Sequence, residues 1–197
     1  MNEQTENPQP LFQQTDQEYH ELVAKHHELE DRLTQLTAKH YLSEQDQLTL
    51  EFAGVYRHYH SCLMRTLAIG RVDPRLAEMH KAAVEALHAA EAALKPGQTF
   101  GGVFDAHAGV LDGLGHRAHR LNACGYSLGT TFAPNWMDWP MLYHDNPVPV
   151  APGMVIFLHM IVFDAEQGLA MTLGRTSEVT ATGAQVLSRA TLDFALS

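Results

Sequence analysis

One segment with strong helix start and stop signals limits the possible folds most, because strand-like sequence lies on both sides of it. Asp73 is a typical N-cap residue, Pro74 suits the first helical position, and Pro96-Gly97 ends the segment. Thr99 predicts the cap of a second helix, which ends near Gly113. The buried stripe of the first helix is predicted to comprise Leu76, Met79, Ala83, Leu87, Ala90 and Leu94.

Strand patterns precede and follow these two helices. Residues 47–70 predict two strands that are joined near Ala53-Gly54. Residues 154–163, MVIFLHMIVF, and the sequence after them predict further strands with turns at Asp164-Ala165 and Thr182-Gly183. Two groups of strands around a helix pair indicate the α+β fold class.

The sequence divides into three regions. Residues 1–16 are polar and predict a disordered tail. Residues 17–46 predict an amphipathic helix and a linker, and residues 47–197 predict the main domain. The helix could pack on its own domain or could dimerise through an apolar stripe. That stripe comprises Leu22, Leu29, Leu33 and Leu36.

Composition and charge exclude several classes of function. The net charge of −10 would repel phosphate backbones, so we expect no nucleic-acid partner. The apolar run at residues 154–163 is about half the length of a membrane-spanning helix, so we expect no membrane partner. The first ten residues lack an apolar secretion signal, and the chain has only two cysteines. These features predict a cytoplasmic protein with reduced thiols.

A cluster of metal-binding residue types lies at residues 58–62. On a strand, His58, His60 and Cys62 would project from the same face. Such a set could hold zinc only with a fourth ligand from elsewhere, for which His144 and Asp145 are the available candidates. The alternative is an exposed or hydrogen-bonded strand face with no metal.

Five segments together resemble a known family. In chain order they are TLEFAGVYRHYHSCLMRTLAIG, LKPGQT, ACGYSLG, APGMVIFLHM and GRTSEVTATG. They resemble sequence blocks of the creatinase/aminopeptidase P superfamily, the M24 or pita-bread proteins. The first and third segments are most similar to its non-peptidase branch, which includes creatinase, ectoine hydrolase and a dimethylsulfoniopropionate lyase. The resemblance implies an α+β pita-bread domain that is shortened at its N-terminus.

The resemblance also implies a changed metal site. Active peptidases of the family hold two divalent metals with two Asp, one His and two Glu. A further family histidine would fall at Ala133. Only one of the five ligand positions keeps a carboxylate here, and a guanidinium would repel a dication. We therefore expect no metal and no other cofactor. The five positions correspond to Glu51, Cys62, Tyr126, His159 and Arg175.

Three functions follow from this comparison. The first is a metal-independent, creatinase-like hydrolase or lyase that acts on a small amino-acid-like compound. His159 would be its acid and base near neutral pH, beside Glu51 as the carboxylate partner, with Tyr126 as proton donor. Its substrate-binding residues would be Cys62, Arg175, Trp136 and Trp139.

The second function is that of an inactive pseudoenzyme, a homodimer that binds a ligand or oligomerises. The third is a metal-dependent Xaa-Pro peptidase. Cys62 could be a nucleophile or a small buried residue that fills the space of an aspartate. His40 precedes Glu51 by eleven residues, and no role is assigned to it, to His58 or to His60.

Overall fold

A computed structural model describes residues 42–132 and 134–196 of the chain. The predicted tail at residues 1–16 and the leucine-striped helix lie outside the described residues. His40 and Ala133 lie outside them too.

The described chain forms an eight-stranded sheet. Its main path runs in the order β1-β2-β6-β5-β3-β4, while β7 pairs with β6 and β8 runs parallel to β2. The other pairings are antiparallel. The strands are β1 (Gln47–Tyr56), β2 (Tyr59–Ala68), β3 (Gly125–Ser127), β4 (Asp138–Met141), β5 (Val155–Asp164), β6 (Leu169–Val179), β7 (Ala184–Val186) and β8 (Ala195–Leu196).

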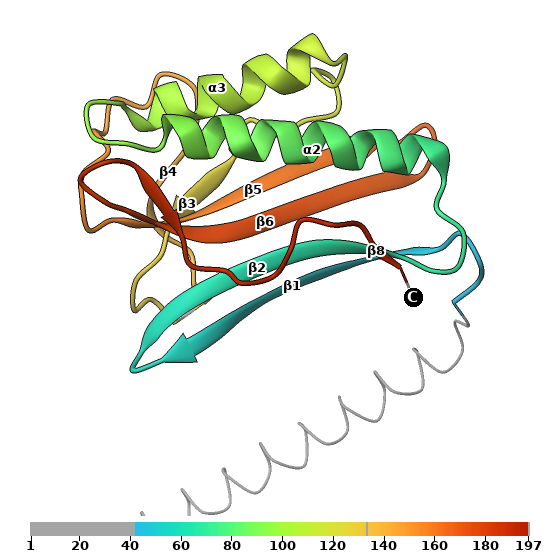
Figure 1. The fold of residues 1–197 in the computed structure, drawn as a ribbon, viewed down its shortest axis with the longest axis horizontal. Helices are drawn as coiled ribbons and strands as arrows, with labels where there is room; N and C mark the ends of the chain where they lie inside the picture. The colour runs from blue at the N-terminus through green and yellow to red at the C-terminus, as the bar shows by residue number, and fades with distance from the viewer. Residues whose placement is uncertain (1–41, 133, 197) are drawn as a thin grey trace, which may run out of the picture. The chain divides into compact units, whose positions relative to one another are not determined.

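Two helices, α2 (Pro74–Ala93) and α3 (Phe100–Gly113), cover the same face of this sheet (Figure 1). Their starts confirm the sequence prediction, because Asp73 accepts a hydrogen bond from the Arg75 amide and Thr99 accepts one from the Gly102 amide. All six residues of the predicted stripe are buried. They pack with β5 and β6 in the main core. The predicted α+β class is confirmed.

The first strand pair turns at a different place from the predicted one. β1 continues through Ala53-Gly54, and the turn lies at Arg57-His58, between the paired residues Tyr56 and Tyr59. Arg57 and His58 both have positive φ angles, of 48° and 72°. His58 therefore belongs to the turn, which contradicts its predicted place on a strand face with His60 and Cys62.

The alternation of side chains gives the sheet a second apolar layer. In β5, Ile156, Leu158 and Met160 join the main core under the helices, whereas Phe157 faces the other way. We call this opposite side the distal face. Its buried residues are Cys62, Met64, Tyr126, Leu128 and Phe157.

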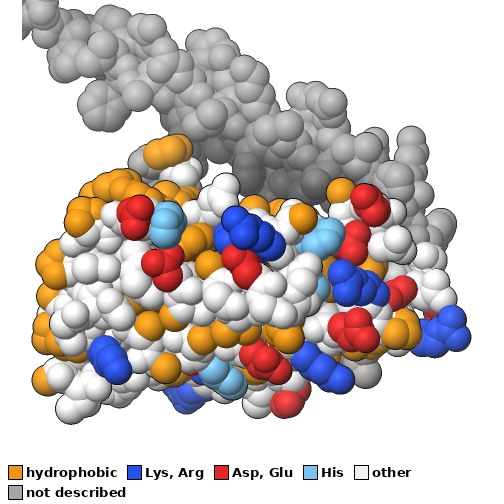
Figure 2. All heavy atoms as spheres, turned by 90° about the horizontal axis from the view of Figure 1, so that it is seen from above, with side chains coloured by type: hydrophobic (Ala, Val, Ile, Leu, Met, Phe, Trp, Pro, Cys, Tyr) orange, Lys and Arg blue, Asp and Glu red, His pale blue; other side chains and the backbone are white. Residues whose placement is uncertain are grey.

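The surface over the helices carries mixed charges. Figure 2 shows acidic, basic and histidine side chains scattered among one another there, without a large area of one sign. No helix within residues 42–132 or 134–196 is long and apolar enough to cross a membrane.

Candidate functional site

Strand register brings four of the five predicted site positions to the distal face. Ala53 pairs with Cys62, so Glu51, two residues before Ala53, lies on the same face as Cys62. Tyr126 pairs with Phe157 across β3 and β5. His159 follows Phe157 by two residues and therefore shares its face.

The Tyr126 hydroxyl is the polar centre of this group. Trp136 donates its indole N–H to that oxygen over 3.0 Å. The side chains of Glu51 and Cys62 lie close enough to this hydroxyl for it to lower the pKa of both groups against the effect of burial. Because the hydroxyl accepts from Trp136, its own hydrogen can be donated to the Glu51 carboxylate. Trp136 thus orients Tyr126, a contact that the sequence did not indicate.

Burial sets the protonation of these groups. It raises the pKa of the Cys62 thiol to about 12 and also raises the pKa of Tyr126. Both groups therefore keep their protons at neutral pH, and Cys62 lacks the thiolate that a nucleophile needs. Glu51 is exposed as a residue, but protein atoms around its carboxyl group remove part of its hydration and raise its pKa, and the nearby Tyr126 hydroxyl opposes this shift.

His159 is not poised near neutral pH. Burial lowers its pKa to about 4, and its Nδ1 atom has no hydrogen-bond partner among the described residues. Its ring lies against Tyr126, with ring centres 5.7 Å apart. Glu51 is not among the groups that shift the pKa of His159. A carboxylate beside the ring would raise this pKa, so the role of Glu51 as carboxylate partner of His159 stays a prediction.

Arg175 lies on the other side of the sheet. It pairs with Leu158, whose side chain belongs to the main core, so the Arg175 side chain points toward α2. There its Nε and NH2 groups donate to the two carboxylate oxygens of Glu91 over 2.6 and 2.7 Å. The prediction that Arg175 lines the site is wrong. Neighbouring residues of a strand point to opposite faces, so Gly174, not Arg175, lies on the distal face.

The residue that faces His159 on the next strand is Gly174. A Cβ atom at Gly174 would come within 2.6 Å of the Phe157 ring. This ring therefore fills the space in which a fifth, glutamate ligand would lie. Within the described residues, no group of three or more His, Cys, Asp or Glu side chains is arranged to hold a metal ion. The described residues of the distal face do not fit a pair of divalent metals.

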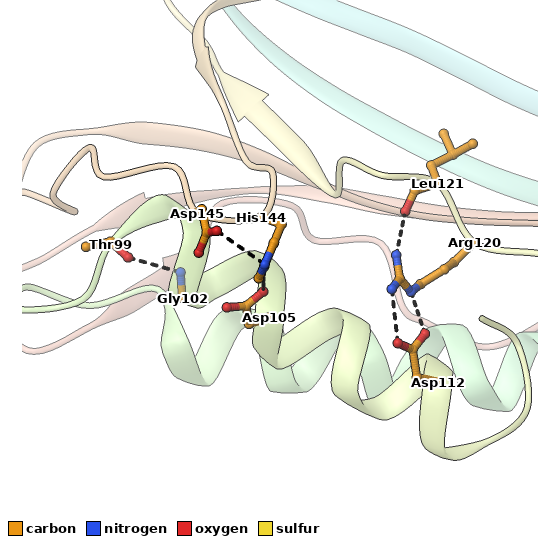
Figure 3. A network of polar contacts seen from close by, with 8 residues as sticks. All are labelled: Thr99, Gly102, Asp105, Asp112, Arg120, Leu121, His144 and Asp145. Carbon is orange, nitrogen blue, oxygen red and sulfur yellow. Dashed lines mark hydrogen bonds and ion pairs between the residues drawn. The ribbon is translucent and has the colours of Figure 1, made fainter. Parts of the chain in front are cut away.

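The alternative zinc site is not assembled either. His144 donates from Nδ1 to Asp105 of α3 over 2.8 Å, and Asp145 lies 3.4 Å from its other ring nitrogen (Figure 3). These contacts hold His144 on the helix side of the sheet. Cys62 lies on the distal face, so the two proposed parts of the zinc site are on opposite sides.

A cavity of about 770 Å³ lies next to the Tyr126 group. Trp139 lines it, as the sequence predicts for a pocket wall, but Trp136 does not. Among the residues that the structure describes, Glu51, Tyr126 and His159 are not part of its lining. Several lining residues lie two positions along the strands from the distal cluster, a step of about 7 Å. These are Val55, His60, Leu128 and Val155.

Comparison with protein families gives one match over most of the chain. The sequence pattern of metallopeptidase family M24 matches residues 19–181. An uncharacterized hydrolase/peptidase of Sinorhizobium fredii is 31% identical over 147 residues, which are 73% of this chain and 35% of the relative. An ectoine hydrolase of Halomonas elongata is 27% identical over 62% of this chain and 31% of its own length. The chain thus spans about a third of these curated relatives.

Solved structures show the same fold. A dipeptidase PepE of Mycobacterium ulcerans superposes with a TM-score of 0.72 at 23% identity, over 79% of this chain and 41% of that protein. An X-Pro aminopeptidase of Thermotoga maritima gives a TM-score of 0.73 at 16% identity, over 79% of this chain and 43% of that protein. These comparisons confirm the pita-bread fold.

Proposed function

Since the chain belongs to metallopeptidase family M24, we propose that it is a metal-independent hydrolase or lyase domain that acts on a small amino-acid-like compound. The observation that supports this most is the pair of Glu51 and Tyr126, a carboxylate close to a phenol on the distal face. Cys62, Tyr126 and His159 stand where the family resemblance places metal ligands. The reaction would therefore depend on protein acids and bases.

Glu51 is the base of the proposed reaction. Partial loss of hydration raises the pKa of its carboxyl group and makes it a better proton acceptor than a fully solvated glutamate. In hydrolysis it takes a proton from the attacking water, and this proton then passes to the leaving nitrogen. In a lyase reaction it takes a proton from carbon instead, the electron pair of that C–H bond forms a double bond to the adjacent carbon, and the leaving group departs from that carbon with its bonding electrons.

Tyr126 and His159 have supporting roles. The Tyr126 hydroxyl, held by Trp136, has one hydrogen to donate. Once Glu51 has taken the proton of the attacking water, this hydrogen can turn from Glu51 to the oxygen that becomes negative during attack and stabilise it. His159 stays neutral at pH 7 because burial lowers its pKa to about 4. Its ring can therefore orient Tyr126 or accept a hydrogen bond, while Glu51 performs the proton transfer.

A second candidate function is ligand binding without turnover. The burial of Tyr126 and His159 favours it. Tyr126 is only 3% exposed and His159 only 6% exposed, within an apolar cluster that fills much of the distal face. In this alternative, the domain binds a small molecule in the neighbouring cavity or forms a homodimer. It differs from the first proposal in having no reaction at Glu51.

One experiment separates these functions. Full-length protein is incubated with a panel of ureido compounds, amides and Xaa-Pro dipeptides, with a chelator and separately with Mn²⁺, Co²⁺ or Zn²⁺. The proposed hydrolase or lyase turns over a compound equally well in the chelator, and Glu51→Gln reduces kcat at least about 100-fold. Glu85→Gln, an exposed change on α2, is the matched control.

Other results would contradict the proposal. Turnover that disappears with chelator and returns with metal would show the metal-dependent peptidase. Binding of a panel compound without any turnover would favour the second candidate. Equal kcat for Glu51→Gln and wild type would remove Glu51 from the reaction.

A further inference from the structure

The 770 Å³ cavity is built at the ends of several strands. Its lining comes from the β1–β2 hairpin tip, the end of β3, β4 and the start of β5. A volume of this size matches cavities that hold small molecules. Its lining residues Leu128 and Val55 lie two positions from Tyr126 and four positions from Glu51 along their strands. A compound in the cavity would therefore have to extend about 13 Å along the sheet to reach Glu51.

Exposed aromatic rings dominate the cavity wall. Tyr56, Tyr59 and Trp139 are 73%, 66% and 67% exposed, respectively. Large apolar rings at a solvent-open cavity are costly for a protein to leave uncovered, and they are typical of surfaces that bind a partner or ligand. A flat or apolar group in the cavity would cover these rings.

The cavity has no charged side chain in its described lining that could pair with a charged ligand. No Asp, Glu, Lys or Arg is among its lining residues in the described part of the chain. A charged ligand group would lose its water there without gaining an ion pair, which is unfavourable. A cation is disfavoured further at Tyr56, because the Arg57 guanidinium already lies 5.4 Å from the centre of that ring.

The polar groups of the wall suit an amide. The Nδ1 of His60 lies 3.3 Å from the Gly129 carbonyl oxygen, which can only accept, so Nδ1 carries the hydrogen. In a neutral His60 ring, Nε2 is therefore an acceptor for an N–H group. Ser61 and Ser127 add hydroxyl groups that can donate to a carbonyl oxygen.

From these features we infer that the cavity binds the uncharged aromatic part of an amide compound. This inference rests on the proposed function for its reactive end, since the Glu51–Tyr126 pair would act on the same bound molecule. It defines the substrate class as neutral amides that carry an aromatic or bulky apolar group.

Calorimetric titration of full-length protein at pH 7.5 tests the inference with four probes. N-acetyl-L-phenylalaninamide carries both the ring and the neutral amide, and N-acetylglycinamide lacks the ring. N-acetyl-L-phenylalanine carries a negative charge, and benzyltrimethylammonium carries a positive one. We expect the first probe to bind at least about tenfold more tightly than each of the other three.

Trp139→Ala should weaken binding of N-acetyl-L-phenylalaninamide about fivefold, because it removes one stacking ring. Phe163→Ala is the matched control, since Phe163 is an exposed aromatic residue, 47% exposed, that does not line the cavity. It should change the dissociation constant less than about twofold. Thermal unfolding of both variants checks that each is folded.

Several outcomes would overturn the inference. They are tighter binding of either charged probe, equal binding of the probe without a ring, or unchanged affinity in Trp139→Ala. Loss of self-association in Trp139→Ala, without probe binding to the wild type, would instead assign the cavity to contact between two copies. Binding without turnover leaves the cavity assignment intact and contradicts only the proposed reaction. Turnover of a small non-aromatic compound, without binding of N-acetyl-L-phenylalaninamide, would support the proposed reaction and contradict the cavity assignment.

Discussion

At the scale of single residues, the Arg175–Glu91 pair shows how one side chain can serve the fold although its sequence position suggested a site. The two side chains are 15% and 11% exposed, and they join β6 to α2. Burial lowers the pKa of the Arg65 guanidinium, and the nearby charge of Arg175 lowers it further. Glu91 therefore compensates positive charge in a place with little access to water.

Glu91→Gln should lower the free energy of unfolding by about 3 kcal/mol, because it leaves the Arg175 charge without its partner. Glu85→Gln on the exposed side of α2 should change it by less than about 0.5 kcal/mol. Urea unfolding measures both variants. Joint replacement of Glu91 and Arg175 by Met should recover much of the loss. An unchanged midpoint for Glu91→Gln would show that the ion pair does not contribute to stability.

The sequence could place most of the site residues on one face, but it could not predict their protonation. The family resemblance grouped Glu51, Cys62, Tyr126 and His159, and the strand register of the structure places them on one face. Protonation could not be read in the same way, since the pKa of His159 depends on burial by residues distant in sequence.

At the scale of elements, helix ends were predictable and the strand turn was not. Asp73 and Thr99 cap their helices through local contacts, which depend only on nearby sequence. The β1–β2 turn at Arg57-His58 lacks the usual Asn or Gly, so Gly54 was the more obvious signal. The family alignment that placed Cys62 on the distal face gave the wrong face for Arg175, because an alignment error of one residue reverses the face of a strand residue.

The unusual turn leads to a prediction about stability. Positive φ angles at Arg57 and His58 are unfavourable for residues with a Cβ atom, whereas Asn-Gly is suited to a two-residue hairpin turn. Arg57→Asn with His58→Gly should raise the free energy of unfolding by about 1 kcal/mol, as measured by urea unfolding. His58→Gly alone keeps Arg57 over Tyr56 and separates backbone strain from the loss of that contact. A lower unfolding midpoint for the double variant would argue against strain at this turn.

At the scale of the whole molecule, the sheet separates two environments with different tasks. The helix side holds the larger apolar core, and the distal face holds a smaller cluster together with the proposed reactive pair. Both sides bury histidine, since His107 lies in α3 and His159 lies on the distal face. Acid should therefore weaken both layers at once.

Burial lowers the pKa of both His107 and His159 from the ordinary 6.5 to about 4. The unfolded chain binds these protons first as the pH falls, so the stability from burying neutral rings is complete above about pH 6.5 and is lost toward pH 4. Each ring accounts for a loss of about 3 kcal/mol across this range. Urea unfolding at pH 7.5, 6.0 and 5.0 should show this decline.

His107→Gln makes the origin of the acid sensitivity measurable. This variant has one fewer buried ring to protonate, so its free energy of unfolding should depend less steeply on pH between 6.5 and 5, whatever its stability at pH 7.5. His88→Gln, at an exposed position of α2, should keep the wild-type slope. Raised pKa values act in the opposite direction, and the exposed His144 beside Asp105 is one such group. An equal slope for His107→Gln and wild type would assign the acid sensitivity to other groups, because the buried His107 ring would then carry no proton-linked free energy.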